Sequence, residues 1–400
     1  MQRRTVRNEG GGVPQLTTSP DSVRSSEFLD RPGAVDAGDA GDATNAGVAA
    51  HYGNPLSEQR DLAAGSAIVD LSHRAVITIT GPDRLRWIDS LTSQSVARLT
   101  PGESTETLLL NITGRIESAV RLIDDGTDLW LLLEREEASG LLQWLGGMQF
   151  MMQVTLADRS VDFATIGTLG QPALPVAAPH GLPLVWRDPW IGVSQGGYQY
   201  AIVTRHPAAS WNYSELLLPR TELAGIAASA IPVAGLLALE ALRIAAWRPR
   251  FATEVDDKTI PHELDWLRTA VHLNKGCYRG QETVAKVHNL GHPPRRLVML
   301  YLDGPDTGLP TRGDEVVVLN NNDNAVGELS TVGQVTSIAR HFELGPVALA
   351  VIKRSTDPLA ELLVRASGRV IPARQVVIVP PDAGASATVP RLPRLGSVRR

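Results

Sequence analysis

The chain has a single cysteine, Cys277, in 400 residues. One thiol excludes an intramolecular disulfide and is typical of proteins from a reducing compartment. The N-terminal stretch MQRRTVRNEGGGVPQ contains arginines, but no apolar segment follows them, so it does not have the pattern of a secretory signal. These absences predict a cytoplasmic protein.

Membrane-spanning runs and a strong net charge are absent as well. Residues 223–239 are uncharged, but the run is short for a membrane span and contains Ser229 and Pro232. We therefore expect a buried helix there and no membrane partner. The net charge of −5 argues against generic nucleic-acid binding. The sequence also lacks a strand pattern of aromatic and basic residues, so an RNA-binding module is the least supported function.

One region departs from this acidic average. Residues 268–296 hold six Lys or Arg and one acidic residue, a formal charge of +5, together with three histidines. An exposed basic face explains this basic island most simply. A site for an anionic ligand or partner is the alternative, and Cys277 lies within the island.

The two ends of the chain have the composition of disordered segments. Residues 1–48 consist mainly of Gly, Ala, Asp, Ser and Thr, and residues 382–400 are similar, with a basic end. Between them, residues 107–134 predict three strands joined by tight turns, and a helix is expected at 136–146. Short strands at regular spacing over residues 291–381 predict a small β-barrel. The expected fold class is α+β.

The segment PVAGLLALEALRIAAW, residues 232–247, predicts an apolar helix. Its two charged residues, Glu240 and Arg243, are three positions apart and share one face. A buried arginine needs a partner. Either the carboxylate of Glu240 or an anionic group of a bound ligand would serve.

The cysteine lies in the stretch HLNKGCYRGQETVAK. Gly276 and Gly280 predict a loop that enters a helix, with Glu282 in the first helical turn. A thiol beside Lys275 and Arg279, close to a helix N-terminus, ionises more readily than a free cysteine. This setting favours a reactive role.

Two other roles for Cys277 remain open. Most lone cysteines are inert core residues. A pair with His272 or His288 would make a nucleophilic site, although the sequence does not show whether either ring lies nearby. Nothing near Cys277 has the pattern of a zinc site, because such a site needs several Cys or His ligands at set spacing.

The motif KGCYRGQE is similar to the signature of the YgfZ family, folate-binding proteins related to the aminomethyltransferase (T-protein) of the glycine cleavage system. The motif comprises Lys275, Gly276, Cys277, Tyr278, Arg279, Gly280, Gln281 and Glu282. LEALRIAAWRPRF resembles a Leu-Arg-x-x-x-Gly helix of the superfamily, IPHEL the segment before the cysteine loop, and VGQVTSIARHFELGPVALAVIKR the C-terminal barrel. The resemblance covers about residues 50–380.

This resemblance implies two interleaved α+β domains and a C-terminal β-barrel, arranged as a ring around a central folate site. The folate-binding region would be residues 49–290. One domain would combine residues 49–72 with 145–225, and the other would combine residues 73–144 with 226–290.

The resemblance also implies a function: a tetrahydrofolate-binding factor for the assembly or repair of iron–sulfur clusters in client enzymes, including enzymes that modify tRNA. Its partners would be folate and iron–sulfur client proteins. Cys277, Lys275 and Glu282 would carry the chemistry, while Arg243 and Glu263 would contact folate. Without a second cysteine, oxidation of Cys277 would end in a sulfenic acid or a mixed disulfide.

The sequence departs from the aminomethyltransferase pattern at two places. These enzymes carry an acidic pair on a hairpin where this chain has Ser118 and Ala119. Glu117 is adjacent, but strand alternation would point its side chain to the other face. In a second segment, SQGGYQY, Gln195 stands in place of a glutamate. Both changes remove carboxylates that position or deprotonate an amine. A folate-dependent aminomethyltransferase is therefore the disfavoured, alternative function.

Overall fold

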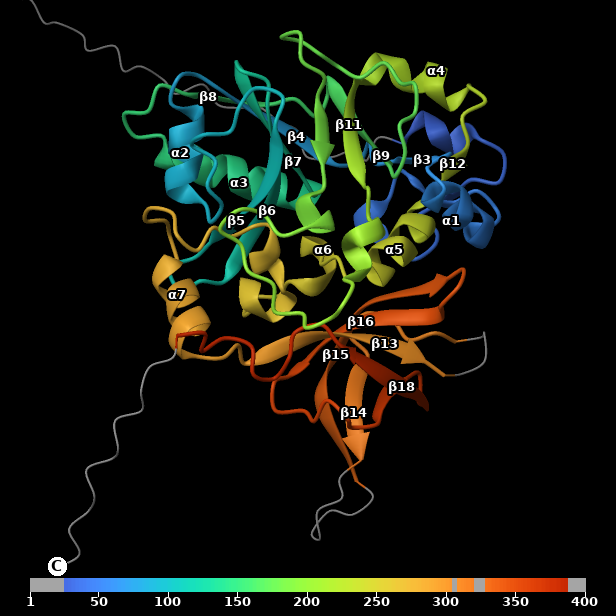
Figure 1. The fold of residues 1–400 in the computed structure, drawn as a ribbon. Coiled ribbons are helices and arrows are strands. Elements are labelled where there is room, and N and C mark those ends of the chain that lie inside the picture. The colour runs from blue at the N-terminus through green and yellow to red at the C-terminus, as the bar shows by residue number, and fades with distance from the viewer. Residues whose placement is uncertain (1–24, 304–307, 320–327, 388–400) are drawn as a thin grey trace, which may run out of the picture.

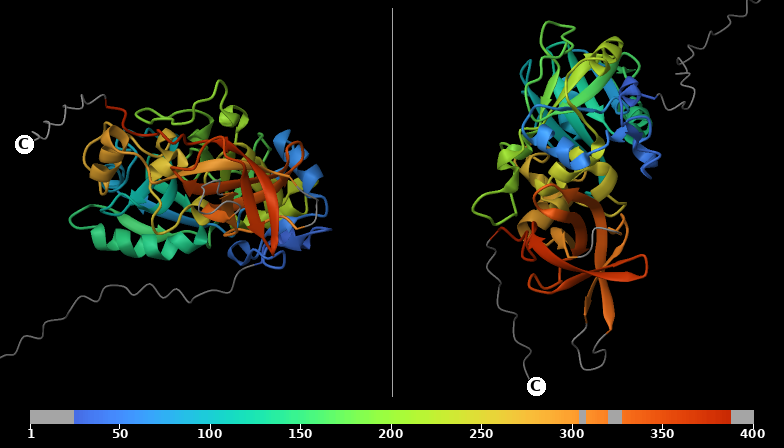
Figure 2. Two further views of the ribbon diagram at one scale, coloured as in Figure 1. Left: turned by 90° about the horizontal axis from the view of Figure 1, so that it is seen from below. Right: turned by 90° about the vertical axis from the view of Figure 1, so that its right-hand side faces the viewer.

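The computed structural model describes residues 25–303, 308–319 and 328–387 (Figure 1). Two five-stranded sheets form the upper part of the molecule, and a closed barrel lies below them (Figure 2). This combination of sheets, helices and a small C-terminal barrel confirms the expected α+β fold class.

The first sheet is antiparallel, with the strand order β5-β6-β7-β4-β8. Its strands are β4 (Ala75–Thr80), β5 (Ser104–Leu110), β6 (Ile116–Asp124), β7 (Asp128–Leu133) and β8 (Thr155–Asp158). Helices α2 (Arg84–Leu91) and α3 (Arg135–Met148) cover one face, where Trp87 and Leu141 pack among buried strand residues. Each large apolar side chain buried there contributes about 1.5–3 kcal/mol. The opposite face joins the main core of the molecule.

The second sheet has the order β10-β11-β9-β3-β12, in which only β12 runs parallel to its neighbour. Its strands are β3 (Ile68–Asp70), β9 (Phe163–Thr168), β10 (Val185–Arg187), β11 (Ser214–Pro219) and β12 (Val233–Ala234). Helices α1 (Pro55–Ala63) and α5 (Leu236–Ala245) pack on the face that carries Val69. Helix α4 (Leu223–Ala227) covers the other face.

The two sheets are interleaved along the chain. After β3 the chain leaves the second sheet, forms the first sheet, and returns at β9. Two strands differ from the expected division. β8 pairs with β4 in the first sheet and β12 pairs with β3 in the second, so the expected limits at residues 145 and 226 each misplace one strand. A single short edge strand leaves little trace in composition, which explains both errors.

The barrel is closed, with the order β13-β16-β15-β14-β17-β18, as residues 291–381 predicted. Its strands are β13 (Arg295–Leu302), β14 (Glu315–Leu319), β15 (Leu329–His341), β16 (Gly345–Lys353), β17 (Leu362–Ala366) and β18 (Arg369–Val377). Alternate residues of β13 face two different cores. Val298 and Leu300 fill the barrel, whereas Leu297 and Met299 pack in the main core. The barrel is therefore joined to the sheets by a shared apolar interior.

Short elements connect these parts. The pair β1 (Val35–Asp36) and β2 (Ala49–His51) precedes α1, while α6 (Phe251–Glu254) and α7 (Gln281–Leu290) lie between α5 and the barrel in sequence. The 3₁₀ helices are η1 (Glu27–Asp30), η2 (Ala43–Asn45), η3 (Pro189–Ile191), η4 (Pro207–Ser210), η5 (Arg220–Glu222), η6 (Pro261–Leu264) and η7 (Trp266–Arg268).

The N-terminal segment corrects the expectation of disorder over residues 1–48. From residue 25 onward it is folded, and residues 1–24 lie outside the described residues. Phe28 is fully buried against α4, and the Asp36 carboxylate accepts hydrogen bonds from backbone N–H groups of the segment. One buried aromatic ring and aspartates that stabilise turns outweigh the bias towards small residues.

The C-terminal end is also partly folded. Residues 382–387 are described, whereas 388–400 lie outside the described residues. Ala383 is buried, and the Ser386 hydroxyl donates to the His288 backbone carbonyl. The first residues of the expected disordered tail therefore pack against α7.

The uncharged run 223–239 is not one buried helix. It contains α4, β12 and the start of α5. Pro232 lacks a backbone N–H, so one continuous helix through this run is disfavoured. Within the described part of the chain, no helix combines the length and hydropathy that crossing a membrane would require.

Candidate functional site

The cysteine loop leads from η7 into α7, at the left edge of the molecule in Figure 1. Gly280 is the N-cap of α7 and has a φ of +83°. A Cβ at this position would lie 2.6 Å from the Asn111 carbonyl oxygen, so both conformation and space require glycine. Gly276 has no such restriction, since a Cβ there would meet no atom within 4 Å. Cys277 is exposed, so it is not the inert core residue of the first alternative.

Lys275 anchors this loop to the end of α2. Its Nζ donates to the backbone carbonyls of Asp89, Thr92 and Gln94, the last two at 2.9 and 2.7 Å. The Asp89 carboxylate lies 3.4 Å from the same nitrogen. Burial lowers the pKa of Lys275. Since all three N–H groups of the ammonium have protein acceptors, Lys275 acts as a structural clamp.

Arg279 also has partners outside the loop. Its guanidinium donates to the Glu117 carboxylate at 2.7 Å and lies over the Trp144 ring. Both cations of the loop thus have acidic partners, and their effect on the Cys277 thiolate stays a prediction. Glu282 is exposed in the first turn of α7, as predicted.

The remaining motif residues hold the loop together. The Gln281 side chain donates to the Lys275 carbonyl at 3.2 Å, and Tyr278 is buried, which raises its pKa. The two candidate histidines have other hydrogen bonds. His288 Nδ1 lies 3.0 Å from the Tyr200 hydroxyl, and His272 Nδ1 accepts from the Asn274 N–H. These contacts give no support to a Cys–His pair.

Arg243 is buried, and protein groups take all its donors. Its guanidinium binds Glu240 at 2.7 Å and Glu254 at 3.0 Å, and it also donates to the Arg248 carbonyl and the Ser337 hydroxyl. Nε bonds to Glu240 as well, so all five N–H groups are used. Of the two expected partners, the structure shows the carboxylate of Glu240 and leaves no donor for a folate tail.

Glu263 is equally committed to the protein. It is fully buried, and Arg295 binds its two carboxylate oxygens at 3.0 and 2.8 Å.

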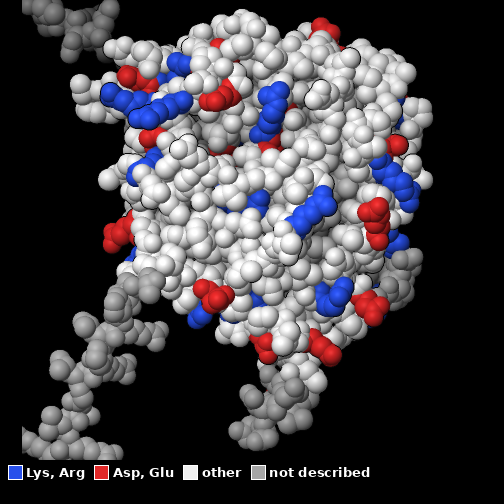
Figure 3. All heavy atoms as spheres, viewed as in Figure 1, with Lys and Arg blue, Asp and Glu red and all other residues white. Residues whose placement is uncertain are grey.

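The basic island does not form an exposed basic face. Arg268 and Arg296 are buried, and Lys275, Arg279 and Arg295 are paired with acidic residues. Basic and acidic side chains are also interspersed on the face shown in Figure 3.

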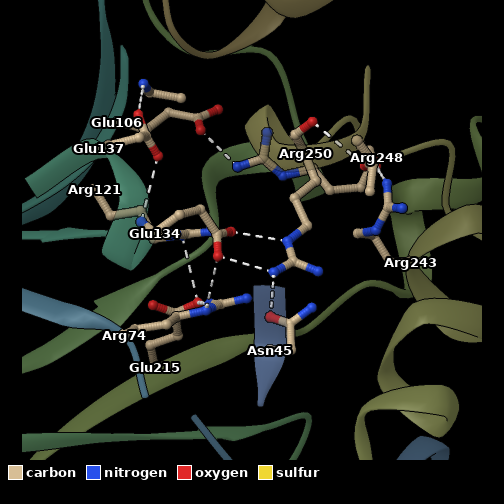
Figure 4. Close-up of polar contacts among 12 residues, drawn as sticks. Asn45, Arg74, Glu106, Arg121, Glu134, Glu137, Glu215, Arg243, Arg248 and Arg250 are labelled. Carbon is tan, nitrogen blue, oxygen red and sulfur yellow. Dashed lines mark hydrogen bonds and ion pairs between the residues drawn. The ribbon is translucent and has the colours of Figure 1, made fainter. Parts of the chain in front are cut away.

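A second candidate site lies where the two sheets meet the segment after α5 (Figure 4). It is a cluster of buried arginines and carboxylates, which we call the central cluster. Its members are Arg74, Glu106, Arg121, Glu134, Glu137, Asp188, Glu215, Glu240, Arg243, Arg248, Arg250 and Glu254.

Ion pairs across the central cluster join distant segments. Arg250 binds Glu134 at 2.8 Å and the Asn45 side chain at 2.9 Å. Arg248 binds Glu106 at 2.5 Å and Asp188 at 3.0 Å. Arg250 therefore ties the segment after α5 to the first sheet and the N-terminal segment, while Arg248 ties it to both sheets.

The surroundings shift the pKa values of two of these carboxyl groups in opposite directions. Burial opposes ionisation of Glu134, but the neighbouring Arg250 and Arg74 outweigh it and hold the pKa well below its usual range. Glu137 forms no ion pair within the described part of the chain, and burial raises its pKa to about 8 against the weaker effects of the Ala119 N–H that it accepts and of Arg121. Two glutamates three positions apart thus have different charge states at neutral pH.

Two small cavities border the central cluster. They share Arg121 and the stretch 248–250, and their volumes are about 30 and 20 Å³. Each has room for a water molecule but not for a pteridine ring. Within the described residues, Arg74 Nε, Arg248 Nη1 and Glu215 Oε2 are buried without a hydrogen-bond partner, and all three residues line the larger cavity. The wall of the larger cavity thus carries two hydrogen-bond donors and one acceptor that no described residue satisfies.

No family model matches the chain. An aminomethyltransferase from Herpetosiphon aurantiacus is 25% identical over 340 residues, which cover 82% of this chain and 90% of that protein. Another from a Synechococcus strain is 27% identical over 344 residues, with 82% and 90% covered. The aminomethyltransferase T of the glycine cleavage system from Bartonella henselae has a similar structure. Its TM-score is 0.67 at 19% identity, over 90% of this chain and 98% of that one.

These matches support a relationship between this chain and the T-protein superfamily. Ser118 and Ala119, the positions where the aminomethyltransferase pattern has an acidic pair, lie on β6. Ser118 is buried and Ala119 lines the smaller cavity, so β6 presents no carboxylate there. Glu117 is exposed and paired with Arg279, and Gln195 is also exposed.

The residues of the central cluster are the ones that sequence reasoning missed. Arg243 and Glu240 were expected to share a face, but Arg74, Glu134 and Glu215 lie in or at the ends of apolar strands, with no spacing that links them. The available signal was the stretch WRPR after α5, where two arginines flank a proline directly behind an apolar helix. Buried arginines there require carboxylates from elsewhere in the chain.

Proposed function

We propose that this protein is a tetrahydrofolate-binding, T-protein-like factor that supports assembly or repair of iron–sulfur clusters in cytoplasmic client enzymes, including enzymes that modify tRNA. The resemblance of KGCYRGQE to the YgfZ signature suggests the role. The single observation that carries the proposal is the exposed thiol of Cys277 on a loop that Lys275 clamps to the end of α2. A thiol held in this way can be reached by a partner protein.

The larger cavity of the central cluster is the proposed folate site. A pterin edge carries both hydrogen-bond donors and acceptors, and it would meet Arg74 Nε, Arg248 Nη1 and Glu215 Oε2, which have no hydrogen-bond partner among the described residues. The aromatic residues Trp211 and Tyr213 line the same cavity. Because both cavities are small, folate can enter only if side chains that border both of them, such as Arg121 and Arg250, rearrange. Arg243 and Glu263 are not needed as contacts.

The Cys277 thiol would act by thiol–disulfide exchange. The Cys277 sulfur attacks a disulfide of a small thiol compound or a client protein, a mixed disulfide forms, and the second sulfur leaves as a thiolate. Because the chain has no other cysteine, release requires an external thiol.

The test is deletion of the gene followed by complementation with wild type, Cys277→Ala or Cys277→Ser. We expect wild type alone to restore the activities of several iron–sulfur enzymes. Both variants should melt at the wild-type temperature, because the side chain is exposed. Full rescue by Cys277→Ala would contradict the role of the thiol. Calorimetric titration with a folate tests the proposed folate binding, and no binding by wild type would refute it.

Aminomethyl transfer is the second candidate, favoured by the relatives named aminomethyltransferase. We expect no such activity, because Ser118 and Ala119 offer no carboxylate at the cavity wall. The assay supplies an aminomethyl-lipoyl carrier protein and tetrahydrofolate and measures methylenetetrahydrofolate. A turnover above that of a heat-treated sample would restore the enzymatic alternative.

A further inference from the structure

One histidine and two aspartates outside the central cluster bring their donor atoms together. Asp125 directly follows β6, Asp128 begins β7, and His180 lies in the segment between β9 and β10. His180 Nδ1 is 2.9 Å from Asp125 Oδ2 and 3.9 Å from Asp128 Oδ2. Within the described part of the chain, these three residues form the one group of His, Cys, Asp or Glu whose ligand atoms all lie within 4.8 Å of one another.

The turn between β6 and β7 holds both carboxylates in place. Asp125 Oδ1 accepts the Thr127 and Asp128 N–H groups at 2.9 and 2.7 Å, and its Oδ2 accepts the Trp130 indole N–H at 2.8 Å. Asp128 Oδ1 accepts the Thr80 hydroxyl. Because these bonds come from the hairpin and its neighbouring strand, the two free lone-pair directions towards His180 are fixed before any ligand arrives.

The carboxylates carry more negative charge than the surrounding residues balance. Asp125 is 4% exposed and Asp128 is 8% exposed. Among the described residues, neither forms an ion pair with a lysine or arginine, and His180 supplies one positive charge at most. Asp128 Oδ2 also accepts no hydrogen bond from the described residues, although it lies on the side of His180. Buried carboxylates without a cation partner are typical of metal sites.

The donor set and its spacing fit a transition metal. Zn²⁺ binds histidine nitrogen and carboxylate oxygen at about 2.0–2.2 Å, and tetrahedral geometry then separates the ligand atoms by about 3.4 Å. The two distances from His180 Nδ1, 2.9 and 3.9 Å, lie on either side of that value. Mg²⁺ and Ca²⁺ prefer oxygen ligands alone, so the imidazole favours Zn²⁺ over them.

We propose that Asp125, Asp128 and His180 bind a divalent transition-metal ion such as Zn²⁺, through the two Oδ2 atoms and Nδ1. The ion takes the place of the proton between Nδ1 and Asp125. That proton leaves to solvent, and the imidazole keeps its other proton on Nε2. The Trp130 N–H continues to orient the Asp125 carboxylate, and a water molecule completes the tetrahedron.

Bound metal would join the two sheets. The β6–β7 turn belongs to the first sheet, and the segment that carries His180 leads into β10 of the second. The site shares no residue with the cysteine loop or the central cluster, so it goes beyond the proposed function and does not depend on folate or on the thiol.

The experiment is calorimetric titration of the full chain with zinc chloride at neutral pH. It uses Cys277→Ser as the parent, because the exposed thiol is itself a zinc ligand. We expect one Zn²⁺ per chain, which an excess of Mg²⁺ does not displace. Adding His180→Ala or Asp128→Asn should weaken this binding at least about tenfold. His51→Ala is the control, because this half-buried histidine of β2 lies outside the group, and its affinity should equal that of the parent.

Melting temperatures provide a second readout. Zn²⁺ should raise that of the parent and of His51→Ala but not that of His180→Ala, which remains folded because the His180 side chain is exposed. If His180→Ala binds Zn²⁺ as tightly as the parent, the ion is held elsewhere and the proposal is overturned. The same conclusion follows if a normally folded parent binds no Zn²⁺, or if His51→Ala weakens binding as much as His180→Ala.

Discussion

At the scale of single residues, Lys275 illustrates how a motif position can be structural. The sequence places a cation beside a thiol, which is typical of thiolate stabilisation. In the structure the ammonium instead satisfies three backbone carbonyls and approaches Asp89. A lysine and a cysteine two positions apart can thus serve different purposes, one holding the loop and the other facing the solvent.

Replacing Lys275 with methionine should therefore destabilise the fold. Methionine fills a similar volume but leaves the carbonyls of Asp89, Thr92 and Gln94 without this donor, at a cost of about 1–3 kcal/mol in the free energy of unfolding. Urea denaturation measures the loss. Lys286→Met, at an exposed position of α7, is the matched control and should change stability by less than about 0.5 kcal/mol. Equal stabilities of the two variants would contradict the clamp.

At the scale of elements, the start of α7 depends on one of its two glycines. Gly280 has a positive φ and touches the turn after β5, while Gly276 meets no neighbouring atom. We expect Gly280→Ala to cost about 1–3 kcal/mol, from the left-handed backbone and the contact with Asn111. Gly276→Ala should cost less than about 1 kcal/mol. Chemical denaturation of both variants checks this, and a larger loss at Gly276 would refute it.

Elements with their own local pattern could be predicted from sequence. The three strands within 107–134, the helix near 136–146 and the β-barrel follow from alternation, turn residues and spacing, and the structure has β5 to β7, α3 and β13 to β18 there. Edge strands such as β8 and β12 have no such pattern. Their place is set by which neighbour they pair with, which is information from elsewhere in the chain.

The candidate site divides in the same way. The cysteine loop is continuous in sequence, so its glycines and helix start could be predicted, and α7 begins at Gln281 directly after Gly280. The central cluster joins residues from Arg74 to Glu254 that have no fixed spacing. For Arg243, burial could be predicted. The choice between Glu240 and a ligand could not, because it depends on how many donors Glu254 and Ser337 take up.

At the scale of the whole molecule, the central cluster holds the parts together. Arg250 joins the N-terminal segment and the first sheet, and Arg243 reaches the barrel through Ser337. Breaking a buried ion pair costs more than the pair itself contributes, because one charge is left unpaired. Stability as a function of pH should therefore reflect the carboxyl groups of this cluster.

Glu137 gives the clearest prediction of this kind. Its pKa is raised to about 8 in the folded chain, whereas the ordinary value is 4.5, so folding binds a proton between these values. The stability from this group is fully present below pH 4.5 and is lost as pH rises towards 8. Glu134 has a lowered pKa and acts in the opposite sense at acidic pH, but it is present in both proteins compared below.

The measurement is the free energy of unfolding in urea at pH 5.5, 6.5 and 7.5 for wild type and Glu137→Gln without ligand. The difference, wild type minus variant, should decrease by about 1.4 kcal/mol per pH unit, because glutamine cannot release a proton. Glu136→Gln should keep the wild-type dependence, since that side chain is exposed. Parallel curves for wild type and Glu137→Gln would mean that Glu137 is ionised in the folded chain.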